Sequence, residues 1–349
     1  MREQKTIRVL QIAPSLGVHG GIEGVAISIL SQCLRAGTVD AKLLFRIRTG
    51  REPSDDFHDL IRPFRQRVFQ FRRNPFILFR LILRADIVHC HYPFVWAFLP
   101  AVLLGKKTII TIHNKKPPGR IMVRGMEKLA IRLADRSVFN SNFVASTWGF
   151  TPGSDERVPA IAERTKLSVP FGERRGFVVV ARLIPEKGVA VLVEAYQKAG
   201  IDHAAMPLVI VGAGPERERL QEMALRRHGE HISFVGHRHG NEKTALVAAS
   251  RWNVAPAIYQ EDQGMTPIEA AICGIPSIVS RIGGLPESAG PGAITVPPGD
   301  IGSLTRALET AAIMQPAEYE KRCSLNEEYF EQYLPSPSHY SSEYALLMS

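Results

Sequence analysis

The sequence lacks a long apolar segment. Its longest uncharged apolar run, residues 94–104, holds about 11 residues and stops before Lys106, whereas a helix needs roughly 18–20 apolar residues to cross a bilayer. The opening stretch MREQKTIRVLQIAP also lacks the apolar core and the cleavage site of a secretory signal. Neither a membrane-spanning nor a secreted protein is indicated, and we expect a cytoplasmic one.

Cysteine is scarce and widely spaced. The sequence has no CxxC pair, which leaves no support for a zinc site or a disulfide-stapled scaffold. We therefore expect reduced thiols at all four cysteines, Cys33, Cys90, Cys273 and Cys323.

The chain does have ample length and an uneven charge. Its 349 residues are more than a single hydrophobic core usually organises and fit two domains. The composition, 45% hydrophobic and 22% charged, is ordinary for globular proteins. Residues 1–168 carry 27 Lys and Arg against 13 Asp and Glu, whereas residues 169–349 carry 16 against 21. A positive charge confined to one half suggests that this half faces an anionic partner, although a solvated surface is the simpler account.

Short apolar runs alternate with longer amphipathic ones throughout the chain. Such alternation predicts parallel sheets covered by helices on both faces. The strands predicted in the first half are Ile7–Ala13, Ala41–Phe45, Ile87–Cys90, Thr108–Ile112 and Ser137–Phe139, with a helix over Gly21–Ala36. Those predicted in the second half are Phe177–Val180, Leu208–Val211, Ile232–Val235, Trp252–Ala255, Ser277–Val279 and Ala293–Val296, with helices beginning near Lys187, Pro215, Asn241, Met265 and Asp300.

This pattern predicts an α/β fold of two doubly wound, Rossmann-like domains facing across a cleft. The first domain is predicted to span residues 1–168 and the second residues 169–335, joined by the polar, irregular stretch 159–175. Residues 336–349 are expected to form a helix that packs back on the first domain. Because ligands of such sheets bind beyond the carboxyl ends of the strands, the cleft is the expected site.

The most informative stretch is Glu261-Asp-Gln-Gly-Met-Thr-Pro-Ile-Glu269, which follows a predicted strand and opens a predicted helix. Gly264 permits a tight turn, and the next two amides, of Met265 and Thr266, are first-turn donors of the kind that bind phosphate. Glu269 offers acceptors to a ribose diol, and Glu261 to sugar hydroxyls. The stretch fits equally a helix whose first-turn acids complement its dipole.

Two other loops also follow predicted strands. The first is Ala181-Arg182-Leu-Ile-Pro-Glu-Lys187-Gly188. Its arginine can form two parallel hydrogen bonds to a diphosphate, and its lysine adds a positive point charge. Singly such residues are more often surface cations, but together they suggest a pyrophosphate clamp. The loop Gly17-Val-His-Gly20-Gly21-Ile-Glu-Gly24 offers amides to a phosphate but lacks the G-x-G-x-x-G spacing.

Five blocks in order resemble those of the GT-B fold glycosyltransferases of family 4, the large retaining family also called group 1. They are the Gly20-Gly21 loop, the Arg182–Lys187 block, Val211–Leu220, the pair Glu261-x7-Glu269, and Ser280–Glu287. The resemblance runs nearly end to end. It implies an N-terminal domain that binds the acceptor and a C-terminal domain that binds a nucleotide sugar.

The resemblance also implies a role for each matching residue. Arg182 and Lys187 would stabilise the leaving diphosphate, Glu261 would lie near the donor sugar, and His113 matches a position that often faces that sugar. The alternative for His113 is a structural histidine at the end of a strand, with its hydrogen bonds made within the protein. The residues implied in substrate binding are Gly20, Gly21, Gly264, Met265, Thr266 and Glu269.

The implied chemistry needs neither a cofactor nor a metal, because cationic side chains and a helix N-terminus neutralise the leaving group. The nucleotide sugar is a co-substrate, and the sequence has no DxD-like pair in a suitable loop. The acceptor hydroxyl would attack on the face that the diphosphate leaves. One departure from the family is Asp262-Gln263, where a small residue and an aromatic one are usual.

The sequence thus predicts a retaining hexosyltransferase that acts on a glycan or lipid-linked acceptor, in cell-surface polysaccharide or glycolipid synthesis. The alternatives are a nucleotide-sugar 2-epimerase of the same fold, a nicotinamide-dependent oxidoreductase, and an inactive nucleotide-sugar-binding protein. The epimerase would act without an acceptor, and the oxidoreductase would bind its cofactor. No recognised nucleic-acid-binding motif is present.

Residues 61–85 contain seven arginines, five phenylalanines and no acid. Basic residues near an anionic bilayer and inserted aromatics both favour binding. We therefore expect this segment to dock the N-terminal half on an anionic membrane surface, which would make the protein peripheral on the inner face of the cell membrane. The alternative is that the phenylalanines fill the core and the arginines are merely solvated.

Overall fold

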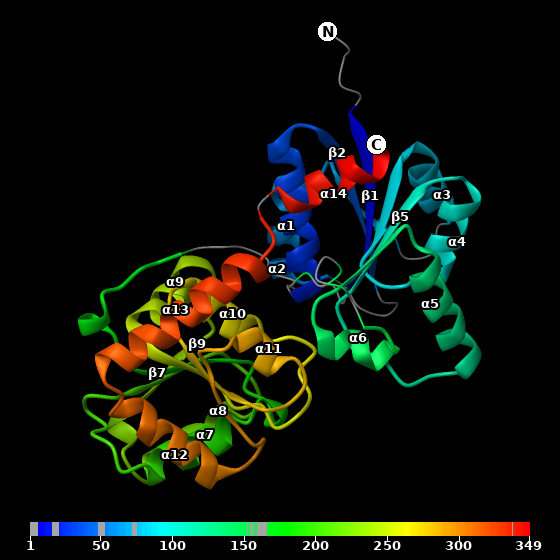
Figure 1. Ribbon diagram of the computed structural model, residues 1–349. Coiled ribbons are helices and arrows are strands. Elements are labelled where there is room, and N and C mark those ends of the chain that lie inside the picture. Colours follow the sequence, from blue (N-terminus) through cyan, green and yellow to red (C-terminus); the bar gives the residue numbers. More distant parts are fainter. Residues whose placement is uncertain are drawn as a thin grey trace. The chain divides into compact units, whose positions relative to one another are not determined.

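The computed structural model describes residues 6–15, 21–47, 53–71, 75–151, 153, 156, 158, 166–336 and 338–349. The chain divides into two compact units (Figure 1). The N-terminal unit comprises Met1–Glu163 together with Leu334–Ser349, and the C-terminal unit comprises Arg164–Tyr333.

The N-terminal unit is built on a six-stranded parallel sheet in the order β3-β2-β1-β4-β5-β6. The order reverses beside β1, which is the doubly wound pattern that the apolar runs predict. The strands are β1 (Ile7–Ser15), β2 (Val39–Ile47), β3 (Val68–Phe71), β4 (Ile87–Cys90), β5 (Lys107–Ile112) and β6 (Arg136–Phe139).

Helices cover both faces of this sheet, as two separate buried clusters show. Side chains of α1, α2 and α14 fill one cluster, and side chains of α3, α4, α5 and α6 fill the other. The helices are α1 (Gly21–Ala36), α2 (Asp55–Ile61), α3 (Pro75–Arg84), α4 (Val95–Leu103), α5 (Ile121–Leu133), α6 (Asn142–Trp148) and α14 (His339–Met348). The last helix of the chain therefore belongs to the core of the first unit.

The C-terminal unit repeats the arrangement with the strand order β12-β11-β10-β7-β8-β9, again all parallel. Its strand order reverses between β7 and β10. The strands are β7 (Arg175–Val180), β8 (Leu208–Val211), β9 (Ile232–Gly236), β10 (Ser250–Ala255), β11 (Ser277–Ser280) and β12 (Ile294–Val296).

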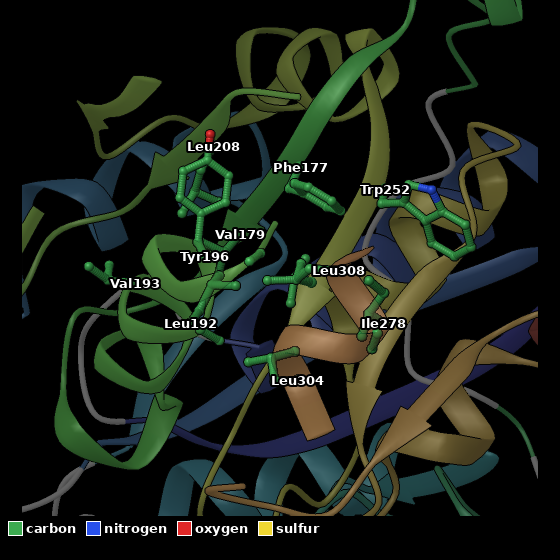
Figure 2. Packing of buried hydrophobic residues seen from close by; sticks show 14 of the residues in the cluster. Phe177, Val179, Leu192, Val193, Tyr196, Leu208, Trp252, Ile278, Leu304 and Leu308 are labelled. Carbon is green, nitrogen blue, oxygen red and sulfur yellow. The ribbon is translucent and has the colours of Figure 1, made fainter. Parts of the chain in front are cut away.

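The main core of this unit lies between the sheet and several helices, chiefly α7 and α12. Leu192 and Tyr196 of α7 and Leu304 and Leu308 of α12 meet strand residues such as Phe177 (Figure 2). The helices are α7 (Val189–Lys198), α8 (Arg217–Leu225), α9 (Gly240–Ala249), α10 (Met265–Ile272), α11 (Leu285–Ala289), α12 (Ile301–Ala312) and α13 (Pro316–Tyr333).

The predicted α/β class of two doubly wound units is confirmed. The alternation of apolar runs did not predict β3, which lies within the basic segment 61–85. This strand is a four-residue edge strand whose phenylalanines, Phe69 and Phe71, are only partly buried. A short edge strand has no continuous apolar run, so periodicity alone does not indicate it.

None of the helices among the described residues combines the length and the apolar character that a membrane span requires.

Candidate functional site

A cavity of about 180 Å³ opens at the carboxyl ends of β7 and β10, where the strand order of the C-terminal unit reverses. This is the position at which doubly wound sheets bind their ligands. Backbone at the two strand ends and the first turn of α10 form its walls. The residues predicted for the site, or adjacent to it, that line the cavity are Lys187, Glu261, Gln263, Gly264, Met265 and Thr266.

The ammonium of Lys187 donates a hydrogen bond to Oε1 of Glu261 and forms an ion pair with it. Lys187 ends a single 3-10 turn, and Gly188 follows with φ +67°. A Cβ atom on Gly188 would lie 2.0 Å from the carbonyl oxygen of Pro256. Only glycine therefore allows the lysine loop to pack so closely on the loop that follows β10.

The loop that carries Glu261 is held by the glycine pair in the Ser280–Glu287 block. The amide of Gly284 donates to the carbonyl of Glu261 over 2.8 Å. A Cβ atom on Gly283, which has φ +58°, would lie 2.2 Å from the same oxygen. This block therefore supports the position of Glu261 and does not itself line the cavity, apart from Leu285.

Gly264 differs in one respect from its predicted role. Its φ is −96°, a value open to any residue, so no left-handed turn requires glycine here. Glycine does leave room for Leu285, because a Cβ atom would lie 2.7 Å from Cδ2 of that leucine and would force its side chain to shift. Its amide donates to Oγ of Ser288 over 2.9 Å. The first-turn amides that remain at the cavity wall are those of Met265 and Thr266.

Glu269 lies one turn into α10, beyond the cavity wall. Its Oε1 accepts a hydrogen bond of 2.7 Å from the ammonium of Lys243 on α9, while Oε2 is buried and has no hydrogen-bond partner. A buried carboxylate oxygen without a donor costs free energy unless a ligand supplies one. Sequence reasoning missed Lys243, since one lysine in the first turn of a helix belongs to none of the motifs.

Arg182 follows β7, but its side chain is exposed and does not line the cavity. The structure therefore brings together Lys187, Glu261 and the first turn of α10, and leaves Arg182 outside that group. Gly20 lies outside the described residues. Gly21 is the exposed first residue of α1.

In the N-terminal unit, a row of buried polar side chains runs from the middle of β1 to the carboxyl ends of β4 and β5. His91 follows β4 and His113 follows β5, and their rings are joined by a hydrogen bond of 3.0 Å between Nδ1 of His91 and Nε2 of His113. Nε2 of His91 also lies 3.0 Å from Oε1 of Gln11 on β1. Nδ2 of Asn140 donates to the carbonyl of His113 over 2.7 Å, which fixes the backbone of that residue.

A third histidine, His89, ties this row to the C-terminal helix. Its Nδ1 lies 2.7 Å from the hydroxyl of Tyr344 on α14, and its Nε2 lies 2.7 Å from Oγ1 of Thr111 on β5. Burial lowers the pKa of His89 to about 3 and that of His113 to about 4, and it lowers the pKa of His91 well below its ordinary value. All three imidazoles are therefore neutral at pH 7.

Among the residues that the structure describes, no three His, Cys, Asp or Glu side chains lie close enough together to hold a metal ion.

Two family models match the chain, one in each half. Residues 19–157 match Glycosyltransferase Family 4, and residues 163–328 match Glycosyl transferases group 1.

Named relatives agree with these matches. A D-rhamnosyltransferase of Pseudomonas aeruginosa is 28% identical over 224 residues, which cover 58% of this chain and 57% of that protein. A glycogen synthase of Mycobacterium tuberculosis is 32% identical over 163 residues, 44% of this chain and 39% of that protein. The alignments thus span about half the length of these relatives, or less.

Solved structures match over nearly the whole chain. HepE of Anabaena, crystallised with UDP, superposes with a TM-score of 0.74 at 16% identity, covering 94% of this chain and 96% of HepE. A glycosyltransferase of Rickettsia africae superposes with a TM-score of 0.73 at 17% identity, covering 99% of both chains. At such low identity the likeness concerns the fold. With its two doubly wound units and a family match in each half, this chain belongs to the group 1, family 4 glycosyltransferases of GT-B fold.

Proposed function

We propose that the protein transfers a hexose from a nucleoside diphosphate sugar to a hydroxyl group of a glycan or lipid-linked acceptor, with retention of the anomeric configuration. The observation that supports this most is the cavity beside β7 and β10. It combines a cation, a carboxylate and the first turn of α10 around one cavity. The matched structures of HepE were obtained with UDP and with UDP-glucose, which agrees with a nucleotide-sugar site.

Each residue of the cavity has a chemical role in this proposal. The amides of Met265 and Thr266 and the positive end of the α10 dipole bind the diphosphate, because a helix N-terminus favours anions. Lys187 neutralises the charge that develops as the sugar–phosphate bond breaks. Arg182, exposed beside the same strand end, is the second cation of the clamp.

The carboxylates serve the sugar parts of the donor. Oε2 of Glu269 is buried without a hydrogen-bond partner and is the acceptor for a ribose hydroxyl. Glu261, paired with Lys187 in the cavity wall, accepts hydrogen bonds from hydroxyls of the transferred hexose. His113 of the N-terminal unit contacts that hexose in the proposal. Gly20 and Gly21 offer amides to the diphosphate.

The proposed reaction uses no divalent metal and no cofactor. A lysine and a helix N-terminus provide the charge that a metal supplies in other transferases. The acceptor hydroxyl attacks on the face from which the diphosphate departs and gives its proton to the departing phosphate. No side chain is assigned as a covalent nucleophile.

The acceptor is proposed from the relatives and from the charge of the chain. One relative, from Mycobacterium tuberculosis, is 34% identical over 171 residues and is named a GDP-mannose-dependent phosphatidylinositol monomannoside mannosyltransferase. A lipid-linked acceptor for this chain would account for the basic N-terminal half. A role in cell-surface polysaccharide or glycolipid synthesis, and docking through residues 61–85 on an anionic membrane, complete the proposal.

A panel of UDP- and GDP-sugars, scored for diphosphate release and for thermal shift, tests the proposed activity. At least one donor should stabilise the protein and release its diphosphate faster when an acceptor glycan is added. Conversion of a free nucleotide sugar to its 2-epimer without acceptor would favour the epimerase. Thermal stabilisation without any turnover would favour an inactive binding protein.

A further inference from the structure

Exposed apolar side chains are concentrated on three helices of the N-terminal unit. Of the twenty large apolar side chains exposed in the described part of the chain, three lie on α3, three on α4 and six on α5. Single exposed apolar residues are ordinary, but a contiguous group marks an interaction surface. The twelve are Phe76, Phe79, Leu83, Leu99, Val102, Leu103, Ile121, Met122, Val123, Met126, Leu129 and Leu133.

The three helices form one layer. Helix α4 contacts both α3 and α5, and all three lie on the same side of the sheet (Figure 1). Their inner side chains, such as Leu81, Phe98 and Ile131, share one buried cluster. The exposed side chains therefore belong to the outer face of a single helical layer.

Helix α5 shows the pattern most clearly. Met122, Met126, Leu129 and Leu133 are spaced by three or four residues and follow one line along the helix, because such spacings fall on one face. Ile131 is buried on the opposite side. A surface helix normally carries polar residues on its outer face. The outer line of α5 is instead apolar, while its inner side holds the Arg124–Glu127 ion pair beside Ile131. A second apolar environment is therefore indicated outside the helix.

The charges on this layer are of one sign. Residues 75–133 contain ten Lys and Arg but only two acids, Asp86 and Glu127. Both acids are neutralised by ion pairs, with Arg8 and Arg124 respectively. No acid lies on α3 or α4. A partner that covers this layer therefore meets apolar groups and positive charge together.

Three arginines of the layer are open to such a partner. Arg80, Arg84 and Arg120 are exposed, and among the described residues none of them has an acidic partner. By contrast, Arg62 and Arg67, earlier in the basic segment, form ion pairs with Asp59 and Asp40.

The phenylalanines divide in the same way. Phe64, Phe69 and Phe71 are partly buried against the core, whereas Phe76 and Phe79 on α3 are exposed. Among the described residues of 61–85, the large apolar side chains exposed to a partner therefore lie on α3. Arg72 and Arg73 lie outside the described residues.

We propose that the outer face of α3, α4 and α5 docks on an anionic lipid bilayer. Apolar side chains of the three helices would enter the headgroup boundary, and Arg80, Arg84 and Arg120 would contact lipid phosphates. Insertion of apolar groups combined with attraction of basic residues is how peripheral proteins bind such membranes. The surface refines the membrane docking of the proposed function and rests on that function for the lipid-linked acceptor. It contains no residue of the donor cavity.

Cosedimentation of the full chain with vesicles tests this surface. One set of vesicles is phosphatidylcholine alone, and the other is phosphatidylcholine and phosphatidylglycerol in equal parts. The chain should bind the anionic vesicles selectively, and salt should weaken the binding.

Two triple variants separate the apolar contribution from the charge. Met122→Ser, Leu129→Ser and Leu133→Ser together should lower the partition coefficient by at least roughly tenfold. Arg80→Glu, Arg84→Glu and Arg120→Glu together should lower it by roughly a hundredfold or more.

The double variant Leu225→Ser and Ile313→Ser is the matched control. These two side chains are 79% and 75% exposed in the C-terminal unit. The control should bind as the parent chain does, since its substitutions remove exposed apolar groups outside the proposed surface.

Thermal shift with UDP and GDP distinguishes this proposal from that of the enzymatic activity. Variants that are still stabilised by nucleotide but no longer bind vesicles would support the surface. A parent chain that binds vesicles but no nucleotide would contradict the proposed donor site and leave the membrane surface in place. Equal binding to neutral and anionic vesicles, or variants that bind like the control, would overturn the proposal. If the parent chain does not bind vesicles but forms a dimer, and the serine variant is monomeric, the surface would instead bind a second copy of the chain.

Discussion

His91 and His113 are joined by a hydrogen bond of 3.0 Å between Nδ1 of His91 and Nε2 of His113, with their ring planes only 15° apart. Because both rings are neutral, one nitrogen must donate and the other accept. In the amide orientation of the structure, Oε1 of Gln11 accepts from His91, so Nδ1 of His91 accepts from His113. His113 is then left with Nδ1 as an acceptor, which suits a hydroxyl donor such as a sugar.

The histidine row predicts a pH dependence of stability. Because the folded pKa values of His89, His91 and His113 lie below the unfolded value of about 6.5, acid protonates the unfolded chain first. The free energy of unfolding of the N-terminal unit should therefore fall between about pH 6.5 and pH 4. Each buried histidine should contribute roughly 1.4 kcal/mol per pH unit.

Hydrogen exchange of the amides of β4 and β5, followed from pH 7.5 to pH 5 and corrected for intrinsic rates, measures this effect. The amides of β7 and β10 in the other unit serve as an internal control and should lose less protection. If protection of both sheets is equal and independent of pH, folding does not lower the pKa of these histidines.

Lys187→Ala should reduce turnover by about 10²–10³, because it removes a charge that acts most strongly as the diphosphate leaves. Diphosphate release at saturating donor is the measurement. Lys198→Ala is a suitable control, since Lys198 pairs with Glu194 on the exposed face of α7. Near-normal turnover in Lys187→Ala would remove the lysine from the proposed mechanism.

Lys243→Ala should weaken nucleoside diphosphate binding by roughly 5- to 150-fold, equivalent to about 1–3 kcal/mol. The reason is that Glu269 would lose the ammonium that neutralises and orients it. Calorimetric titration with UDP and GDP measures the change, and Lys243→Arg should restore most of the affinity. In a double-mutant cycle with Glu269→Gln the two losses should not add, and strict additivity would mean that the pair does not act together.

Diphosphate release should persist in the presence of EDTA and should not rise on addition of Mg²⁺ or Mn²⁺. The physical reason is that Lys187 and the N-terminus of α10 supply the positive charge. Loss of activity in EDTA that Mn²⁺ restores would contradict this part of the proposal.

Much of the fold follows from the sequence, because buried parallel strands are continuous apolar runs. Ile87–Cys90 and Leu208–Val211 match observed strands residue for residue, and the predicted helix Gly21–Ala36 is also found. The edge strand β3 was not predicted because its four residues, interrupted by Gln70 and flanked by arginines, form no continuous apolar run.

The sequence predicts those site residues that lie in motifs directly after strands. It does not predict pairs of residues that only tertiary packing brings together. Lys187, Glu261 and Thr266 follow two strands that are neighbours in the sheet, so their meeting in one cavity could be expected. The pairing of Glu269 with Lys243 joins two helices that no local pattern connects. In the same way, Tyr344 reaches His89 across 255 positions of the chain, a contact that only the packing of α14 produces.

The central claim is that the cavity beside β7 and β10 binds the nucleotide sugar. Hydrogen–deuterium exchange of the full chain, with and without the nucleoside diphosphate that gives the largest thermal shift, tests it most directly. The ligand should slow exchange in peptides that cover residues 179–187 and 261–272. Protection confined to other segments, with exchange unchanged in both of these, would contradict the assignment of the donor site.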